Sequence, residues 1–145
     1  MTLPRPEPGL VIRYSYLWLS EHREGREEGA KDRPCAVVMV LLDADGETRV
    51  TALPITHSPP ANALAAIEIP AETKKRLNLD AERSWIMISE GNEFIWPGPD
   101  VRPLAGGDLS TVAYGMLPPR FFAAVRDRFL ALSRQRKAIS VTRTE

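Results

Sequence analysis

The chain has 145 residues, 43% of them hydrophobic and 26% charged, which is typical of one globular domain. Its 19 basic and 19 acidic side chains cancel, so bulk positive charge is excluded as a way to bind nucleic acid, and only a local patch could do so. No apolar run approaches the ~20 residues of a membrane span, and the N-terminus lacks a signal-peptide core, so we expect a cytoplasmic protein without membrane contact.

The first half of the chain predicts a meander of three strands. Residues 1–8 include three prolines and are expected to form a flexible lead-in. Residues 20–32 are mostly charged, have no apolar face and predict a mobile loop. Asp45-Gly46 favours a tight hairpin turn. The β-branched and aromatic runs predict strands over residues 10–19, 34–42 and 48–55.

The second half predicts shorter elements. Residues 70–77 open with proline and end with basic side chains, as a short helix does. Residues 90–103 are dense in turn residues and aromatics, and no periodicity assigns their structure. Strands are expected near residues 66–69, 84–89 and 111–117.

Residues 118–134 form the clearest helix in the sequence, because their apolar side chains recur at helical spacing and should pack on the sheet. These side chains are Phe121, Phe122, Val125, Phe129 and Leu132. Residues 135–145 carry no core signal and predict a frayed basic tail. Residues 9–134 are therefore expected to be one domain, mainly β with α, built as a small curved antiparallel sheet or barrel with a C-terminal helix.

A cation, a hydroxyl and an imidazole are predicted to share one rim of this sheet. Arg33 stands where the charged loop enters the second strand, and Thr56, His57 and Ser58 follow the end of the third. Guanidinium suits phosphate oxygens, and histidine exchanges protons near neutral pH. A solvated arginine and a hydrogen-bonded strand end are the alternatives.

The hairpin should bring these two strand ends together. If Asp43 pairs near Thr48, then Cys35 faces Thr56, and Arg33 lies about two residues further along the rim. The expected cluster therefore depends on the register of the hairpin.

Other chemistries find little support in the sequence. Ser58 lacks the G-x-S-x-G context of a hydrolase, and His57, adjacent on an extended strand, would point away from it. Cys35 lies in an apolar strand and is expected to be a core residue. No glycine-rich nucleotide motif is present, and two histidines with one cysteine cannot build a His/Cys zinc site, so we expect neither cofactor nor metal.

The unassigned segment adds aromatic and polar side chains, namely Asn92, Phe94, Trp96 and Asp100. Its residues 96–99 (WPGP) could present a flat face on which a base stacks. The alternative is that Phe94 and Trp96 cap the core.

The order of motifs over residues 9–58 has a counterpart in a known family. Glu28 is followed five residues later by Arg33-Pro34, then by a valine-rich strand and by residues 53–56, Leu-Pro-Ile-Thr. This order resembles the MazF/PemK family of toxin endoribonucleases. His57 stands where that family more often has serine directly, and residues 59–117 show little likeness.

The resemblance implies an SH3-like barrel of the MazF/PemK/CcdB type that forms a homodimer and is neutralised by a cognate antitoxin protein. It implies the toxin of a type II toxin–antitoxin system, which cleaves single-stranded RNA without metal by attack of the 2′-hydroxyl on the phosphodiester. Carried onto this chain, the resemblance gives Arg33 the role of stabilising the phosphorane, Thr56 that of holding a phosphate oxygen, and Glu28 that of a supporting group or the base. His57 is a candidate proton carrier that is peculiar to this sequence. Ser58, Asn92 and Trp96 are further residues expected to bind the substrate.

Two alternatives stay open at this point. The same fold family includes gyrase-directed poisons, so the chain could be a non-catalytic barrel that grips a protein target, with residues 96–100 as the grip. A domain without toxicity that binds RNA or a partner is the other.

Overall fold

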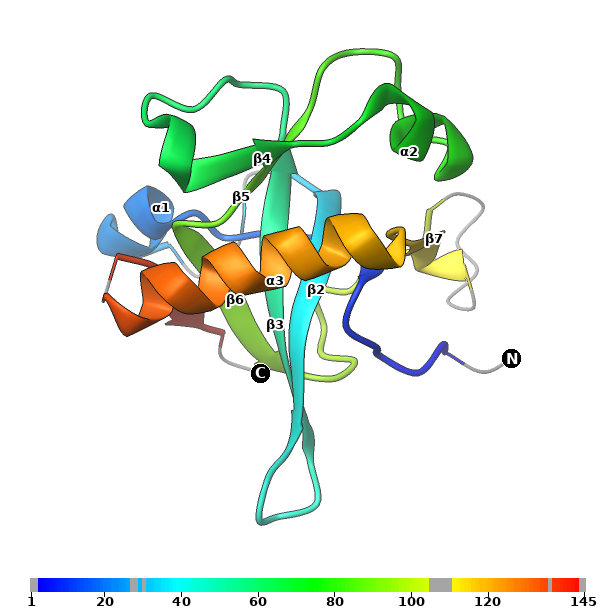
Figure 1. Cartoon of the computed structure of the whole chain (residues 1–145). Coiled ribbons are helices and arrows are strands. Elements are labelled where there is room, and N and C mark those ends of the chain that lie inside the picture. The colour runs from blue at the N-terminus through cyan, green and yellow to red at the C-terminus, as the bar shows by residue number, and fades with distance from the viewer. Residues whose placement is uncertain (1–2, 27–28, 30, 105–110, 136, 144–145) are drawn as a thin grey trace.

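The eight strands of the described chain join in one sheet that branches at β3 (Figure 1). The structure, a computed structural model, describes residues 3–26, 29, 31–104, 111–135 and 137–143. The strands are β1 (Leu10–Tyr14), β2 (Arg33–Leu42), β3 (Thr48–Thr56), β4 (Ala66–Glu68), β5 (Trp85–Met87), β6 (Glu90–Ile95), β7 (Ala113–Met116) and β8 (Ile139–Thr142). The helices are α1 (Leu19–Arg23), α2 (Ala71–Arg76), α3 (Pro119–Arg134) and the 3-10 turn Ala63–Ala65.

The strand order is β4-β5-β3-β2-β1-β7, while β6 also pairs with β3, and β8 pairs with β6. Neighbouring strands are antiparallel except β6 and β8, which run parallel. β3 serves both branches because its residues Arg49 to Ala52 pair with β6, whereas Ile55 and Thr56 pair with β5. The predicted antiparallel sheet is confirmed, but hydrogen bonds between the described strands do not close it into a barrel.

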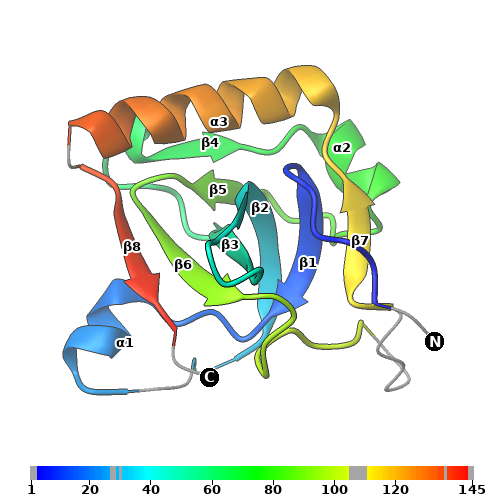
Figure 2. The same cartoon turned by 90° about the horizontal axis from the view of Figure 1, so that it is seen from below.

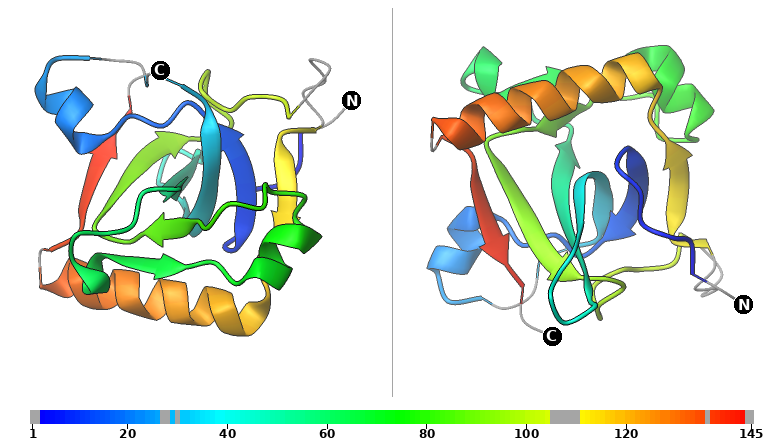
Figure 3. Two further views of the ribbon diagram at one scale, coloured as in Figure 1. Left: turned by 90° about the horizontal axis from the view of Figure 1, so that it is seen from above. Right: turned by 60° about the horizontal axis from the view of Figure 1, so that its bottom comes forward.

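α3 carries the chain across the sheet, from β7 at one edge to β8 at the other (Figures 2 and 3). The predicted apolar stripe is confirmed, since Val125 and Phe129 are buried and Phe121, Phe122 and Leu132 pack on the same core. No helix in the described part of the chain combines the length and apolar character that crossing a bilayer requires.

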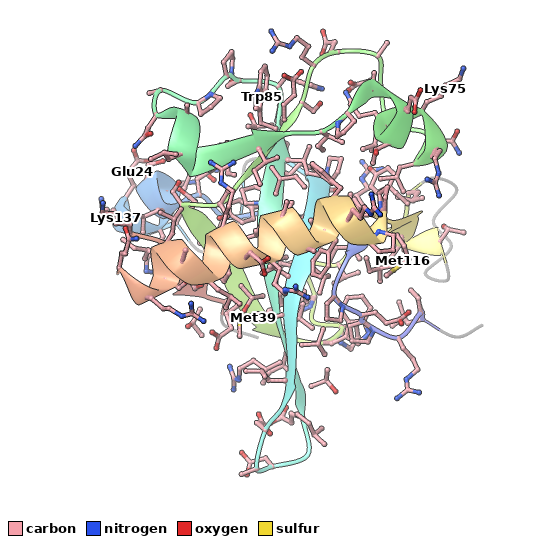
Figure 4. All side chains as sticks on the ribbon, viewed as in Figure 1. Glu24, Met39, Lys75, Trp85, Met116 and Lys137 are labelled. Carbon is pink, nitrogen blue, oxygen red and sulfur yellow. The ribbon has the colours of Figure 1, made fainter. Side chains whose placement is uncertain are left out.

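The central strands are buried on both faces. Val11 and Ala36 face the core beneath α3, whereas their chain neighbours Ile12 and Val37 face a second core on the other side of the sheet. Met39 of β2, labelled in Figure 4, packs at the margin of the first core. Two-sided burial explains why β1 and β2 are almost continuously apolar in the sequence rather than alternating.

The N-terminal strand is shorter than predicted, and the expected loop begins with a helix. β1 ends at Tyr14, and α1 follows Trp18. Carboxylates hold the start of this helix: Glu21 accepts the Trp18 N–H at 3.1 Å, and Glu90 accepts the Leu19 N–H at 2.9 Å. The helix therefore depends on a side chain 71 residues away and not on an apolar face of its own.

The C-terminal segment also differs from the expected frayed tail. β8 adds a parallel strand to β6, which itself lies in the segment that sequence periodicity did not assign. The Arg143 guanidinium donates to the Ser15 carbonyl at 2.7 Å and to Asn92 Oδ1 at 3.0 Å, and it pairs with Asp100 Oδ2 at 3.0 Å. Residues 139–143 are therefore part of the folded domain.

Candidate functional site

A cleft of about 580 Å³ opens at the end of the sheet where β2 begins and β3 ends. Residues 31–34 and 55–61 form two of its walls, and Lys74 and Asp80, from α2 and the turn that follows it, line a third. The start of β2 and the end of β3, which line the cleft, lie at the opposite end of this strand pair from its hairpin turn (Figure 1). The structure thus brings the predicted Arg33, Thr56, His57 and Ser58 to one cavity.

The hairpin register sets Arg33 level with Thr56. Cys35 pairs with Pro54, so the predicted pairing of Cys35 with Thr56 is wrong by two residues. The turn is one residue longer than expected, and a bulge in β2 adds a second shift. Continued to the strand ends, the observed register places Arg33 opposite Thr56, and opposed residues of antiparallel strands share a face.

Arg33 is half-buried in the cleft, with its hydrogen-bonding capacity incompletely used. Its guanidinium carbon lies 4.9 Å from the centroid of the Trp18 ring, which also lines the cleft. Its Nε is buried and has no hydrogen-bond partner among the described residues. An unpaired buried N–H costs roughly 1–3 kcal/mol, so the surrounding protein does not use this guanidinium to full capacity in holding the fold.

The Thr56 hydroxyl is oriented by its own strand end. Its Oγ1 accepts the Ser58 backbone N–H at 3.1 Å. This bond uses one of the two lone pairs of the oxygen, and the hydroxyl hydrogen can still donate to a ligand oxygen. Ser58 contributes its backbone to this geometry, and its exposed side chain lies at the cleft.

His57 belongs to a chain of charged groups at the same cleft. Its Nε2 lies 2.7 Å from Asp80 Oδ2, and its Nδ1 lies 3.3 Å from Glu82 Oε2. Asp80 Oδ1 accepts from Lys74 Nζ at 2.7 Å, and the Lys74 side chain is only 6% exposed. The hydrogen bond from Lys74, helped by its charge and by His57, holds the pKa of Asp80 below its usual value. Asp80 is therefore a carboxylate at neutral pH.

Two predicted substrate contacts lie away from the cleft. Asn92 is fully buried in β6 and binds the backbone N–H and carbonyl of Leu17, both at 2.8 Å. Trp96 packs at the margin of the second core, 6.2 Å from Phe94 between ring centroids. Neither belongs to the described cleft lining, so the structure does not bring these two predicted residues to Arg33 and Thr56. Glu28 lies outside the described residues.

The cleft also contains residues that the sequence did not single out. Trp18 falls in the predicted strand over residues 10–19 and Lys74 in the predicted helix over residues 70–77, whereas Asp80 falls in no predicted element. No local motif marks them, because they reach the site from other elements of the fold. Cys35 is confirmed as a core residue: burial raises the pKa of its thiol strongly, and the nearby Arg33 offsets only part of this effect.

Two clusters in the described chain have the residue types to hold a metal ion, His57 with Asp80 and Glu82, and Asp43 with Asp45 and Glu47. In the first, Lys74 and His57 already occupy the two oxygens of Asp80. In the second, Asp43 Oδ1 accepts the backbone N–H groups of Asp45 and Glu47 at 2.9 and 3.0 Å, and Oδ2 pairs with Arg49. These contacts account for both clusters, and we assign a metal to neither.

Comparison with protein-family models, with curated proteins and with solved structures gave no match to this chain. The interpretation of the cleft therefore depends on its own geometry.

Proposed function

We propose that the protein is an endoribonuclease that cleaves single-stranded RNA without a metal, acting in the cytoplasm as the toxin of a type II toxin–antitoxin system. One observation carries the proposal: the half-buried Arg33 guanidinium, with an unpartnered Nε, rests on Trp18 and lines an open cleft together with Thr56. A guanidinium fork and a hydroxyl donor are the groups that bind phosphodiester oxygens well.

The reaction needs few protein groups, because RNA supplies its own nucleophile. The 2′-oxygen forms a bond to phosphorus, the bond from phosphorus to the 5′-oxygen breaks, and the products are a 2′,3′-cyclic phosphate and a 5′-hydroxyl. Arg33 stabilises the charge that builds up on the phosphorane, and Thr56 donates to one of its oxygens. His57 takes the proton of the 2′-hydroxyl or gives one to the 5′-oxygen.

The local charge supports an anionic substrate although the whole chain is neutral. Three cations, Lys31, Arg33 and Lys74, line the cleft against two carboxylates, Asp32 and Asp80, so the lining keeps an excess of one positive charge with His57 neutral. The proposal includes the SH3-like barrel of the MazF/PemK/CcdB type, although hydrogen bonds between the described strands leave the sheet unclosed. It also includes a homodimer and an antitoxin protein that neutralises the toxin, on the resemblance of residues 9–58 to that family.

The test is cleavage of single-stranded RNA by purified protein in EDTA. The wild type should produce fragments with cyclic phosphate and 5′-hydroxyl ends, and a 2′-deoxy nucleotide at the cleavage position should block the cut. Arg33→Ala and Thr56→Ala should each lower the rate by about 10²–10³-fold, as loss of a transition-state donor does. Arg49→Ala is the matched control, because Arg49 pairs with Asp43 and Glu93 and does not belong to the described cleft lining.

Wild-type rates in both cleft variants would show that the site is assigned wrongly. Toxicity that survives Arg33→Ala without any RNA cleavage would favour a protein target such as gyrase.

A further inference from the structure

A chain of contacts runs from Lys74 of α2 through Asp80 to His57, which follows the end of β3, and proton transfer by His57 alone does not account for it. We propose that Asp80, anchored by Lys74, is a positioning residue that fixes the Nε2–H tautomer of His57 and leaves Nδ1 to exchange protons with the RNA. This inference rests on the proposed function and names the nitrogen atom through which that function works.

Asp80 is held from two sides although its side chain is 52% exposed. Its Oδ1 accepts from Lys74 Nζ at 2.7 Å and from the Glu82 backbone N–H at 3.1 Å. Lys74 also donates to the Glu82 carbonyl, so the ammonium is fixed in turn. The Oδ2 atom of Asp80 is thereby left in a defined position, 2.7 Å from His57 Nε2.

This contact decides which ring nitrogen carries the hydrogen. A carboxylate only accepts hydrogen bonds, so Nε2 must be the donor. A neutral imidazole has a single N–H, and Nδ1 is therefore left with the lone pair that removes a proton from a substrate hydroxyl. Once protonated, the same Nδ1 can return a proton to a leaving oxygen.

The surroundings of Nδ1 differ from those of Nε2. Its charged neighbour is Glu82 Oε2 at 3.3 Å, on a side chain that is 74% exposed. With Glu82 in this place the ring binds both hydrogens, and the neutral Nε2–H form is the one that remains when Glu82 turns away. Among the described residues, the Glu82 carboxylate contacts only His57, whereas Asp80 is fastened by Lys74. Glu82 can therefore move aside for a substrate, and Asp80 cannot move without breaking its contact with Lys74.

A merely structural ion pair would tie α2 to β3 without any need for one tautomer, and Asp80→Asn separates the two roles. The amide introduced by this substitution can keep its oxygen towards Lys74, which turns its NH₂ group towards His57 Nε2. That ring nitrogen must then accept, and the hydrogen of the neutral ring moves to Nδ1. The variant keeps the size of the side chain and reverses the tautomer.

The first readout is the ¹⁵N NMR spectrum of the imidazole nitrogens in the alkaline range, where the ring is neutral. The chain has only two histidines, and His57→Gln assigns the signals. We expect Nε2–H in the wild type, Nδ1–H in Asp80→Asn, and Nε2–H again in Glu82→Gln. The same tautomer in the wild type and Asp80→Asn would overturn the proposal.

The second readout is RNA cleavage. Asp80→Asn should lower kcat roughly 10²-fold with KM unchanged, because general acid–base catalysis is lost while phosphate binding remains. Glu68→Gln is the control, since Glu68 forms an exposed ion pair with Arg83 at 2.7 Å and does not contact His57. Thermal unfolding checks that both variants are folded.

The outcomes of the two readouts separate the inference from the proposed function. A wild type that cuts no RNA would refute the function and, with it, the role of Nδ1 towards RNA, whereas the tautomer data would still decide whether Asp80 orients His57. Asp80→Asn with a reversed tautomer and the wild-type kcat would overturn the positioning role alone.

Discussion

Arg143 and Arg33 are two arginines in similar aromatic settings with opposite hydrogen-bonding states. The guanidinium carbon of Arg143 lies 5.5 Å from the Tyr14 ring centroid, and that of Arg33 lies 4.9 Å from the Trp18 centroid. The side chain of Arg143 is 2% exposed and is bonded to Ser15, Asn92 and Asp100, whereas Arg33 is half-buried with an unpartnered Nε. The contacts of Arg143 therefore stabilise the fold, whereas we expect Arg33 to be available to a ligand.

The largest expected effect is therefore on stability at the Arg143 contacts. Arg143→Met removes the 3.0 Å ion pair with the Asp100 carboxylate, 11% exposed, and the hydrogen bonds to Ser15 and Asn92, while the 3.9 Å contact between Asp100 and Arg102 remains. This loss should lower the free energy of unfolding by about 3–5 kcal/mol. Arg33→Met removes a guanidinium that bonds little and should change it by less than about 1 kcal/mol. Urea unfolding of the two variants measures both values. Equal losses would break the comparison.

The next effect is on catalysis and concerns the shape of the Arg33 cation. Arg33→Lys keeps the charge but replaces a planar fork by a point charge, so RNA cleavage should fall by about 10²-fold while stability is retained. Single-turnover rates at saturating RNA measure the loss. A lysine variant with the wild-type rate would mean that charge alone suffices and that bidentate binding plays no part.

A smaller effect is expected at the aromatic ring beneath Arg33. Trp18→Leu removes a cation–π contact of about 0.5–2 kcal/mol and should lower kcat/KM roughly tenfold. Trp96→Leu is the matched change at the tryptophan that the sequence had favoured, and it should leave kcat/KM unchanged because Trp96 packs at the second core. A larger loss of kcat/KM in Trp96→Leu than in Trp18→Leu would show that Trp96, and not Trp18, belongs to the substrate site.

The same contrast explains what could be predicted from the sequence. The helix over residues 118–134 and the hairpin between β2 and β3 carry their information locally, in a 3.6-residue period and in a turn next to two apolar runs. β6 and β8 do not, because Asn92 lies in a strand without alternation and its partner Arg143 lies 51 residues further on. A buried polar network of this kind is invisible to local patterns.

The part of the site that one hairpin brings together was predictable, and the part that comes from other elements was not. One hairpin joins the two strand ends that carry Arg33, Thr56, His57 and Ser58, so these residues meet at the cleft. The predicted pairing of the two strands was wrong by two residues. Trp18 and Asp80 were missed, since they reach the cleft from elements whose packing the sequence does not reveal.

The smallest expected effect is the pH-dependent contribution of Asp80 to stability. Because the folded state lowers the pKa of Asp80, this contribution is fully present above the unfolded value of about 3.9 and is lost as the pH falls through the lower folded value. The carboxylate is half exposed, so solvent screening limits its contribution to roughly 0.2–1 kcal/mol. Urea unfolding should separate the wild type from Asp80→Asn at pH 7 by this amount and bring them together near pH 2. A difference that persists in acid would show that Asp80 holds α2 by packing and not by charge. Asp80 would then have a structural role like that of Arg143, and not a role at the ligand site like that of Arg33.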